Sequence, residues 1–179
     1  MSKIINHTPR VFTIKNVLDE GECQWFIQLA EYKGFEEADV RTGEGTASMP
    51  SVRNNQRVLI TAPAEGADLF ARIRDHLPLR SGGQALGLPD IIRFYKYSPG
   101  QQFKMHKDGP WMEGGKRSRL TLLVYLNDNF SGGETDFKDF KIKPVQGDAL
   151  VFVHDTWHEG CVIDTGIKYV LRSDIFYDV

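Results

Sequence analysis

The chain has 179 residues, of which 41% are hydrophobic and 26% charged, a composition typical of one globular domain. A formal net charge of −2, without a dense run of lysine and arginine, argues against nucleic acid as a partner. Two cysteines are too few for a disulfide scaffold, and no segment is apolar over the length that a membrane helix needs. The first residues, MSKIINHTPRVF, contain no apolar core of signal-peptide length. We therefore expect a single cytoplasmic domain spanning residues 1–179, with neither nucleic acid nor a membrane as partner.

Two helices are predicted in the first half of the chain. Residues 18–34, LDEGECQWFIQLAEYKG, begin near a capping pair, Asp19 and Glu22, and end at Gly34. The apolar stripe of this helix is predicted to be Trp25, Phe26, Leu29 and Ala30. Residues 65–78, EGADLFARIRDHLP, form the second predicted helix, which stops at Pro78. Its apolar face is predicted to be Leu69, Phe70, Ile73 and Leu77.

After Pro89 the pattern changes to β-branched and aromatic segments that are separated by turns rich in Gly and Pro. The four predicted strands are residues 90–97, 119–127, 148–153 and 167–177. A helix layer that backs a β-sandwich or barrel fits this order of elements best. We expect a mixed α/β but mainly β fold, in which residues 1–89 give helical support and read the substrate and residues 90–179 form the catalytic β core.

Three of these strands carry polar residues at alternate positions, so each strand has a polar face. The residues on these faces are Arg93, Tyr95 and Tyr97, then Thr121, Leu123 and Tyr125, and finally Lys168, Val170 and Arg172. Two cations on one face of an otherwise apolar strand are costly to bury unless they meet an anion. The sequence leaves open whether these faces point to solvent or line a polar cavity.

The stretch FKMHKDGPW, residues 103–111, places His106 and Asp108 two positions apart, so both side chains point to one side if the chain is extended there. A third ligand is offered by FVHDTWHEG, in which His158 follows a strongly apolar strand. Two histidines and one carboxylate, with further positions open, are the ligand set of non-haem Fe(II) oxygenases. His154 competes with His158, because it directly follows Val153 and its spacing does not exclude it.

A series of motifs in the second half resembles the catalytic half of the prolyl-4-hydroxylase-like 2-oxoglutarate/Fe(II) dioxygenases, over about residues 90–178. The motifs are YKYSPGQQFKMHKDG, LTLLVYLN, SGGETDF, KPVQGDALVFVHD, HEG and GIKYVLRSDIFY. The resemblance implies a double-stranded β-helix (jelly-roll) core. It also implies Fe(II), 2-oxoglutarate and O2 as cofactor and cosubstrates, with ascorbate as a candidate reductant. The implied reaction is hydroxylation of a C–H bond with release of succinate and CO2.

The resemblance also assigns roles to single residues. It makes His106, Asp108 and His158 the iron ligands, with His158 preferred over His154 because Glu159 follows it and Lys168 lies ten residues beyond it. Lys168 is the implied partner of the distal carboxylate of 2-oxoglutarate, and Arg172 is its substitute. The remaining residues expected to contact the cosubstrate are Tyr125, Tyr97 and Thr121.

The substrate is less well defined by the sequence. The candidates for substrate contact are Arg53, Asn55, Arg57 and Trp111. The loop GPWMEGGKRS, residues 109–118, suits a mobile lid, with a disordered surface loop as the alternative. A prolyl or related side chain in a peptide or protein is the expected target, and a free amino acid or other small molecule is the alternative. A cupin-type metal-binding module or isomerase, and a non-catalytic copy of the barrel, are the rival interpretations.

Overall fold

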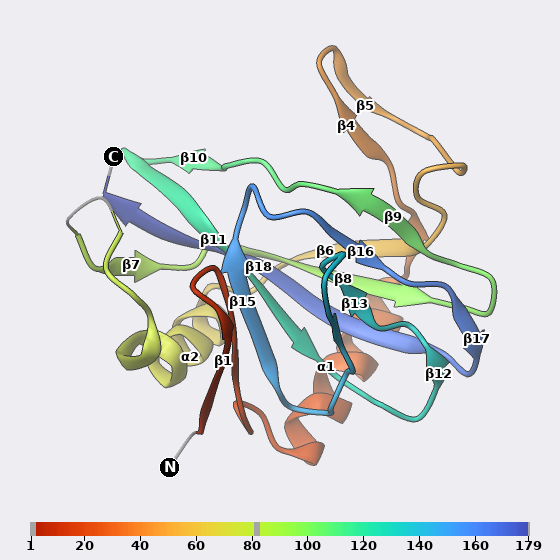
Figure 1. The fold of residues 1–179 in the computed structure, drawn as a ribbon, viewed down its shortest axis with the longest axis horizontal. Coiled ribbons are helices and arrows are strands. Elements are labelled where there is room, and N and C mark those ends of the chain that lie inside the picture. The colour runs from red at the N-terminus through yellow and green to blue at the C-terminus, as the bar shows by residue number, and fades with distance from the viewer. Residues whose placement is uncertain (1–2, 81–82, 179) are drawn as a thin grey trace.

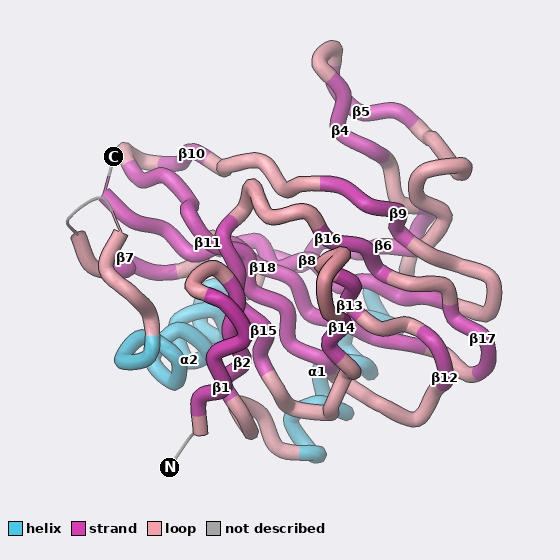
Figure 2. The backbone as a smooth tube through the Cα atoms, viewed as in Figure 1, coloured by secondary structure: helices cyan, strands magenta, loops and turns pink. Residues whose placement is uncertain are grey.

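The computed structural model describes residues 3–80 and 83–178, and most of its regular structure is β-strand (Figures 1 and 2). One large antiparallel sheet contains, in spatial order, β1 (Ile4–Thr8), β2 (Val11–Ile14), β15 (Ala149–Val153), β11 (Lys116–Tyr125), β18 (Lys168–Asp178), β8 (Ile91–Tyr97), β6 (Gln56–Thr61) and β3 (Glu36–Glu37). Two short strands extend this sheet: β10 (Met112–Glu113) beside β11, and β7 (Ala85–Gly87) beside β18.

A smaller sheet contains, in spatial order, β14 (Lys141–Ile142), β13 (Thr135–Asp136), β16 (His158–Gly160) and β9 (Phe103–His106). Two two-stranded sheets complete the strands: β12 (Ser131–Gly132) with β17 (Ile163–Thr165), and β4 (Val40–Thr42) with β5 (Gly45–Ala47). The large and small sheets together form the jelly-roll core that the sequence predicted. The β4–β5 pair projects from the body of the molecule beyond β9 (Figure 1).

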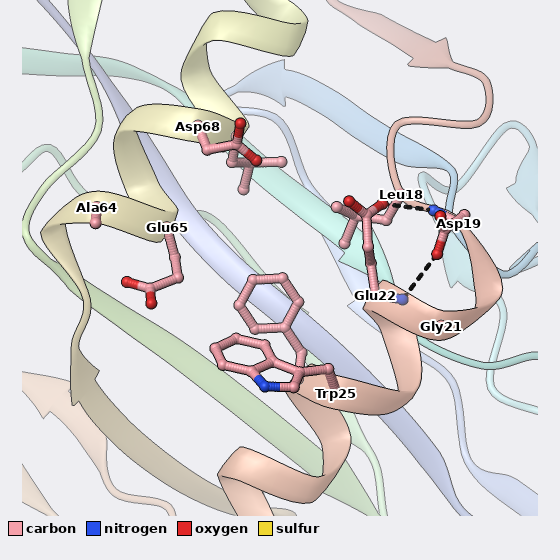
Figure 3. Close-up of a pocket in the computed structure, with 10 residues that line it drawn as sticks. Leu18, Asp19, Gly21, Glu22, Trp25, Ala64, Glu65 and Asp68 are labelled. Carbon is pink, nitrogen blue, oxygen red and sulfur yellow. Dashed lines mark hydrogen bonds between the residues drawn. The ribbon is translucent and has the colours of Figure 1, made fainter.

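Helix α1 (Glu20–Lys33) begins where the sequence predicted, because Asp19 and Glu22 form a capping box. The Asp19 carboxylate accepts from the Glu22 N–H at 2.8 Å, and the Glu22 carboxylate accepts from the Asp19 N–H at 2.9 Å (Figure 3). The predicted apolar stripe is wrong at Trp25, whose exposed fraction is 48%. Cys23 takes that place in the core, next to Phe26.

Helix α2 (Pro63–Ile73) continues into a short 3-10 helix at Arg74–His76. It begins two residues earlier than predicted, because Pro63 occupies the first turn, where its missing N–H costs nothing. Leu69 and Ile73 are buried as expected. Within the described residues, no helix is both long enough and apolar enough to cross a membrane.

The two faces of the large sheet have different surroundings. One face packs with the helices in a single buried cluster, which includes Phe26, Ala30, Leu69, Ile73, Phe94, Leu120, Leu122, Val124 and Leu171. The opposite face, inside the jelly roll, contributes to a second cluster of Val11, Tyr125, Phe137, Leu150, Phe152 and Val170. The all-aliphatic positions of residues 119–127 therefore lie in the core, and the alternating polar positions face the inside of the jelly roll.

Residues 109–118 form regular structure, so the alternative of a disordered surface loop is wrong, and the mobile lid stays a prediction. Met112 pairs with Arg117 and Glu113 with Lys116, which makes the segment a hairpin that extends the large sheet. Its two-residue turn is Gly114-Gly115, with φ values of 55° and 75°. Glycine adopts these left-handed conformations without strain, and tight hairpin turns require them. Strand β11 consequently begins at Lys116, before the predicted start at residue 119.

Candidate active site

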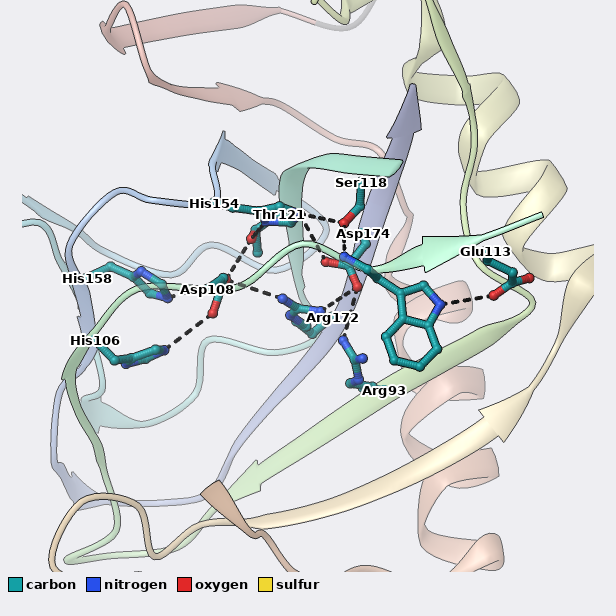
Figure 4. A network of polar contacts seen from close by, with 11 residues as sticks. Arg93, His106, Asp108, Glu113, Ser118, Thr121, His154, His158, Arg172 and Asp174 are labelled. Carbon is teal, nitrogen blue, oxygen red and sulfur yellow. Dashed lines mark hydrogen bonds and ion pairs between the residues drawn. The ribbon is translucent and has the colours of Figure 1, made fainter. Parts of the chain in front are cut away.

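The three predicted metal ligands converge at one end of the small sheet. Strands β9 and β16 pair so that His106 lies directly opposite His158. Asp108 follows β9 and reaches the same point from the turn beyond it (Figure 4). One ligand atom from each of the three residues lies within 4.8 Å of the others, close enough to hold one metal ion.

The two histidines are oriented for metal binding by their own backbone neighbours. The Nδ1 of His106 lies 2.6 Å from the Lys104 carbonyl oxygen, and the Nδ1 of His158 lies 2.9 Å from the Thr156 carbonyl oxygen. Each carbonyl can only accept, so each Nδ1 carries the proton and each Nε2 presents a lone pair. Burial lowers the pKa of His158 to about 4, which keeps the ring neutral as a ligand must be.

Asp108 completes a donor set that fits Fe(II). Its Oδ1 lies 3.6 Å from Nε2 of His106, and its Oδ2 lies 3.7 Å from Nε2 of His158. Burial alone would raise the pKa of this carboxyl, but the Arg172 guanidinium holds it well below its ordinary value. Two neutral imidazoles and one carboxylate on one side of a site are the ligands of non-haem Fe(II) oxygenases.

His154, the rival of His158, lies outside this set. Its ring is buried beside the turn that carries Asp108, where Nε2 is 2.7 Å from Ser118 Oγ and Nδ1 is 2.8 Å from Thr121 Oγ1. Both ring nitrogens are therefore occupied by hydroxyl groups. The structure brings His158, and not His154, to His106 and Asp108.

The site opens into a pocket between the two sheets. Its lining residues are Tyr95, Tyr97, Phe103, His106, Asp108, Leu123, Thr135, His158, Gly160, Lys168, Val170 and Arg172. Across the β18–β8 pair, Lys168 is opposite Tyr97, Val170 opposite Tyr95, and Arg172 opposite Arg93. The polar faces that the sequence left open thus line an internal cavity. A larger surface groove lies between α1 and α2 (Figure 3), and none of the three ligands lines it.

Lys168 is a buried cation at the wall of this pocket, with an exposed fraction of 3%. Its Nζ donates to the Gly133 carbonyl oxygen at 2.6 Å and lies 5.1 Å and 5.7 Å from the ring centroids of Tyr97 and Tyr125. Among residues 3–80 and 83–178 it forms no ion pair with a carboxylate. Burial lowers its pKa to about 8. An incoming carboxylate would supply the missing counter-charge.

Arg172, the substitute for Lys168, already has carboxylate partners. Its Nη1 donates to Asp174 Oδ2 at 2.8 Å, and its Nη2 lies 3.3 Å from Asp108 Oδ2. Arg93 donates to the same Asp174 oxygen at 3.1 Å. This geometry favours Lys168 over Arg172 as the residue that holds the distal carboxylate of the cosubstrate.

The other three cosubstrate candidates lie at different places. Tyr97 lines the pocket opposite Lys168. Tyr125 is buried behind the pocket and shares a hydrogen bond of 2.6 Å with Thr135, a lining residue that the sequence did not single out. Thr121 is not part of the pocket wall. Its hydroxyl instead donates to Asp108 Oδ2 at 2.6 Å. The motif SGGETDF carries Thr135 and could have pointed to it.

Arg53 and Asn55, two of the substrate candidates, are buried next to the pocket. The Arg53 guanidinium lies between the rings of Tyr95 and Phe103, at 4.4 Å and 4.3 Å, and its Nε donates to Asn55 Oδ1 at 2.8 Å. Phe103 in turn stacks on His106, with ring centroids 3.6 Å apart. Arg53 is therefore linked to a proposed iron ligand through one aromatic ring.

The remaining two candidates lie on neighbouring elements. Arg57 is on β6, directly opposite Tyr95 of β8. Trp111 lies at the base of the β10–β11 hairpin, with an exposed fraction of 39%, and its indole N–H donates to Glu113 at 3.0 Å.

The phenol of Tyr95 lies close to several guanidinium groups. Although burial alone would raise the pKa of Tyr95, the nearby guanidinium groups of Arg53, Arg172 and Arg93 lower it.

Comparisons with known proteins agree with this site. The family model of the 2OG-Fe(II) oxygenase superfamily matches residues 92–173. Prolyl 4-hydroxylase 1 of Arabidopsis thaliana is 25% identical over 93% of this chain and 69% of its own length. Eight curated relatives are 24–29% identical to the chain, which spans 59–70% of their lengths.

Solved structures of prolyl hydroxylases share the fold. The viral collagen prolyl hydroxylase of Paramecium Bursaria Chlorella virus-1, in complex with 2OG, superposes with a TM-score of 0.67. It is 23% identical, and the match covers 95% of this chain and 97% of that one. A prolyl hydroxylase in complex with a hypoxia inducible factor oxygen degradation domain peptide fragment, from Trichoplax adhaerens, gives a TM-score of 0.69 at 20% identity. That match covers 94% of this chain and 84% of the other.

Fold and site together define a 2-oxoglutarate- and Fe(II)-dependent dioxygenase. Residues 92–173 match the 2OG-Fe(II) oxygenase superfamily, and the chain as a whole is similar to prolyl 4-hydroxylases in sequence and in fold. Its reaction uses Fe(II), 2-oxoglutarate and O2. When bound, these groups supply the oxidising power, through oxidative decarboxylation of 2-oxoglutarate to succinate and CO2. The cupin and non-catalytic interpretations are not retained.

Proposed function

We propose that this dioxygenase hydroxylates a prolyl or related side chain within a peptide or protein. The proposal rests on one observation, which is that two kinds of functional side chain line the same pocket. It holds the triad of His106, Asp108 and His158, and in the same wall a buried lysine, Lys168, that lacks a carboxylate partner. The names of the curated relatives, and the peptide bound to the Trichoplax adhaerens enzyme, support a peptide as substrate.

We assign the side chains of this pocket as follows. His106, Asp108 and His158 hold Fe(II), because their lone pairs meet at one point. Lys168 pairs with the distal carboxylate of 2-oxoglutarate, beside Tyr97 and Tyr125. The triad and Lys168 thus mark the two ends of the cosubstrate.

The substrate would approach from the side of Arg53, Asn55, Arg57 and Trp111. Arg53 supports this direction, because its Nη2 is buried without a hydrogen-bond partner among the described residues. A buried guanidinium nitrogen without a hydrogen-bond partner favours a ligand that offers oxygen atoms, such as the carbonyl groups of a peptide backbone. A free amino acid, the alternative substrate, offers a carboxylate to the same group.

One experiment separates the two substrate classes. The wild-type enzyme and the Asp108→Ala variant are incubated with Fe(II), 2-oxoglutarate and O2, and with either proline-containing peptides or free amino acids. Succinate is measured together with the mass of the product. Gain of one oxygen atom on a prolyl residue of a peptide, absent with Asp108→Ala, supports the proposal. Oxygen gained only by a free amino acid would establish the alternative.

We also propose a cytoplasmic location and a requirement for ascorbate in repeated turnover. Both cysteines, Cys23 and Cys161, are buried as free thiols, which supports a reducing compartment. Cell fractionation tests the location. Turnover number with and without ascorbate tests the second proposal, and equal turnover numbers would refute it.

A further inference from the structure

His154 contacts Asp108 in two independent ways. Its backbone carbonyl oxygen accepts from the Asp108 N–H at 2.9 Å, which fixes the turn after β9. Its side chain reaches the Asp108 carboxylate through one hydroxyl: Nδ1 of His154 is 2.8 Å from Thr121 Oγ1, and Thr121 Oγ1 is 2.6 Å from Asp108 Oδ2 (Figure 4). The histidine that the sequence left as a rival ligand therefore lies directly behind a proposed ligand.

The chemistry of these groups fixes the direction of each hydrogen bond when the imidazole is neutral. A carboxylate only accepts, so the single Thr121 hydroxyl proton points to Asp108. Thr121 must then accept from His154, which places the ring proton on Nδ1 and leaves Nε2 as an acceptor. Ser118 Oγ, 2.7 Å from Nε2, donates its proton to the ring.

The chain of hydrogen bonds begins at the β10–β11 hairpin. The backbone N–H of Trp111 donates to Ser118 Oγ at 2.7 Å. Four consecutive donors thus point the same way, from Trp111 through Ser118, His154 and Thr121 to Asp108. Hydrogen bonds that share a direction polarise and strengthen one another in a buried setting. His154 and Ser118 are both buried.

We infer that His154 and Thr121 are positioning residues that fix the Asp108 carboxylate for metal binding, with Ser118 and the Trp111 backbone as the start of the chain. Thr121 occupies Oδ2, so the carboxylate is held in one rotation and its other oxygen stays available to the metal. Arg172 Nη2 lies 3.3 Å from the same Oδ2, which adds a charged contact to the neutral chain. This inference rests on the proposed role of Asp108 as an iron ligand.

The test measures binding of Co(II), a redox-stable probe, to the metal-free protein by calorimetry and by its visible absorption. The variants are Thr121→Val, which keeps the shape but loses the hydroxyl, Thr121→Ser, which keeps the hydroxyl, His154→Phe, and the double variant Thr121→Val/His154→Phe. Thr165→Val is the matched control. Thr165 makes an exposed hydroxyl contact of 2.7 Å with Ser131, on the separate β12–β17 pair.

We expect Thr121→Val and His154→Phe each to weaken Co(II) binding about 10–100-fold, the usual effect of removing a partner of a metal ligand. Thr121→Ser and Thr165→Val should bind like the wild type. The double variant should bind about as weakly as Thr121→Val alone, because both changes break one chain. Thermal unfolding shows that each variant is folded at the temperature of the titration.

Several results would overturn the inference. The first is a Co(II) affinity of Thr121→Val and His154→Phe within about twofold of the wild type. The second is an equal loss of Co(II) affinity in Thr121→Ser and Thr121→Val. The third is a loss of Co(II) affinity in the double variant that equals the sum of the two single losses in free energy. If His154→Phe does not fold, the pair Thr121→Val and Thr121→Ser decides alone. Failure of the wild type itself to bind Co(II) would instead refute the proposed ligand set, so the two failures are distinguishable without any substrate.

Discussion

The Nζ of Lys168 lies 2.6 Å from the carbonyl oxygen of Gly133, and this carbonyl is its hydrogen-bond partner in the pocket that also holds the proposed iron ligands. A neutral carbonyl compensates only part of the cost of removing an ammonium group from water. Because the described residues offer Lys168 no carboxylate within ion-pair distance, the ligand-free enzyme carries a charge that its cosubstrate can neutralise.

The first prediction concerns the affinity for 2-oxoglutarate. Lys168→Ala should raise the dissociation constant of 2-oxoglutarate by about 10- to 150-fold, since one charged contact contributes roughly 1.5–3 kcal/mol. Affinity for Co(II) should not change. Calorimetric titration of both ligands measures the two effects, and Lys141→Ala, an exposed lysine paired with Asp136, is the control. An unchanged dissociation constant in Lys168→Ala would transfer the role to Arg172.

A second prediction follows for stability. Lys168→Met keeps the length of the side chain but removes the buried charge, so the ligand-free variant should unfold at higher denaturant than the wild type. The expected gain in the free energy of unfolding is about 1–3 kcal/mol. A concentration of 2-oxoglutarate that saturates the wild type should stabilise the wild type more than it stabilises the variant. A variant less stable than the wild type without ligand would show that Lys168 is satisfied by Gly133.

The pH dependence of cosubstrate binding gives the third prediction. Burial lowers the pKa of Lys168 to about 8, from 10.5 in the unfolded chain. Between these values the unfolded state binds more protons, so ligand-free stability should rise with pH. Affinity for 2-oxoglutarate should fall over the same range, by up to about tenfold for each pH unit above the pKa.

Titration of 2-oxoglutarate binding from neutral to alkaline pH, with proton uptake measured in two buffers, tests this prediction. Tyr97 and Tyr125 should not interfere, because burial raises the pKa of both phenols well above this range. The pKa of Tyr95, which also lines the pocket, is lowered by the nearby guanidinium groups, so the Lys168→Met variant is the required control. In Lys168→Met the pH dependence should disappear. A variant that retained it would place the titrating group elsewhere.

The fourth prediction separates ligands from positioning residues. His106→Ala, Asp108→Ala and His158→Ala should each abolish turnover and the anaerobic charge-transfer band of the Fe(II)–2-oxoglutarate complex. His154→Ala should need more Fe(II) but reach the full band at saturation, because its ring does not touch the metal. Optical titration with Fe(II) measures both. The charge-transfer band could instead be absent at saturating Fe(II) in His154→Ala and present in His158→Ala. That result would make His154, and not His158, the iron ligand.

The fifth prediction concerns the first helix. Asp19→Ala removes the side chain that accepts from the Glu22 N–H, which should cost about 1 kcal/mol of unfolding free energy. Glu22 also binds Arg72 of α2 at 2.7 Å, so loss of the capping box should loosen the helix pair. Chemical denaturation checks the loss against Gln28→Ala on the exposed face. A change in 2-oxoglutarate affinity would contradict the structural role.

Much of this protein is determined by its local sequence. The capping pair Asp19 and Glu22 starts α1, and the alternation of residues 119–127 gives one aliphatic and one polar face. His106 and Asp108 come together because positions two apart in an extended chain share a side. These features depend on neighbours in the chain, and the sequence displays them directly.

Other features were decided by contacts between distant segments. The pairing of β9 with β16 puts His158 opposite His106, while the pairing of β11 with β15 turns His154 toward Thr121. Spacing along the chain could not separate the two histidines, because both follow the same strand.

The choice between Lys168 and Arg172 was decided in the same way. Both cations lie on one face of β18, but among the described residues the tertiary structure brings Asp174 and Asp108 to Arg172 and a carbonyl group, without a carboxylate, to Lys168. A sequence lists the charges of a strand without their partners. Burial and pairing, which set the free energy of each charge, are defined only when the sheets close around the pocket.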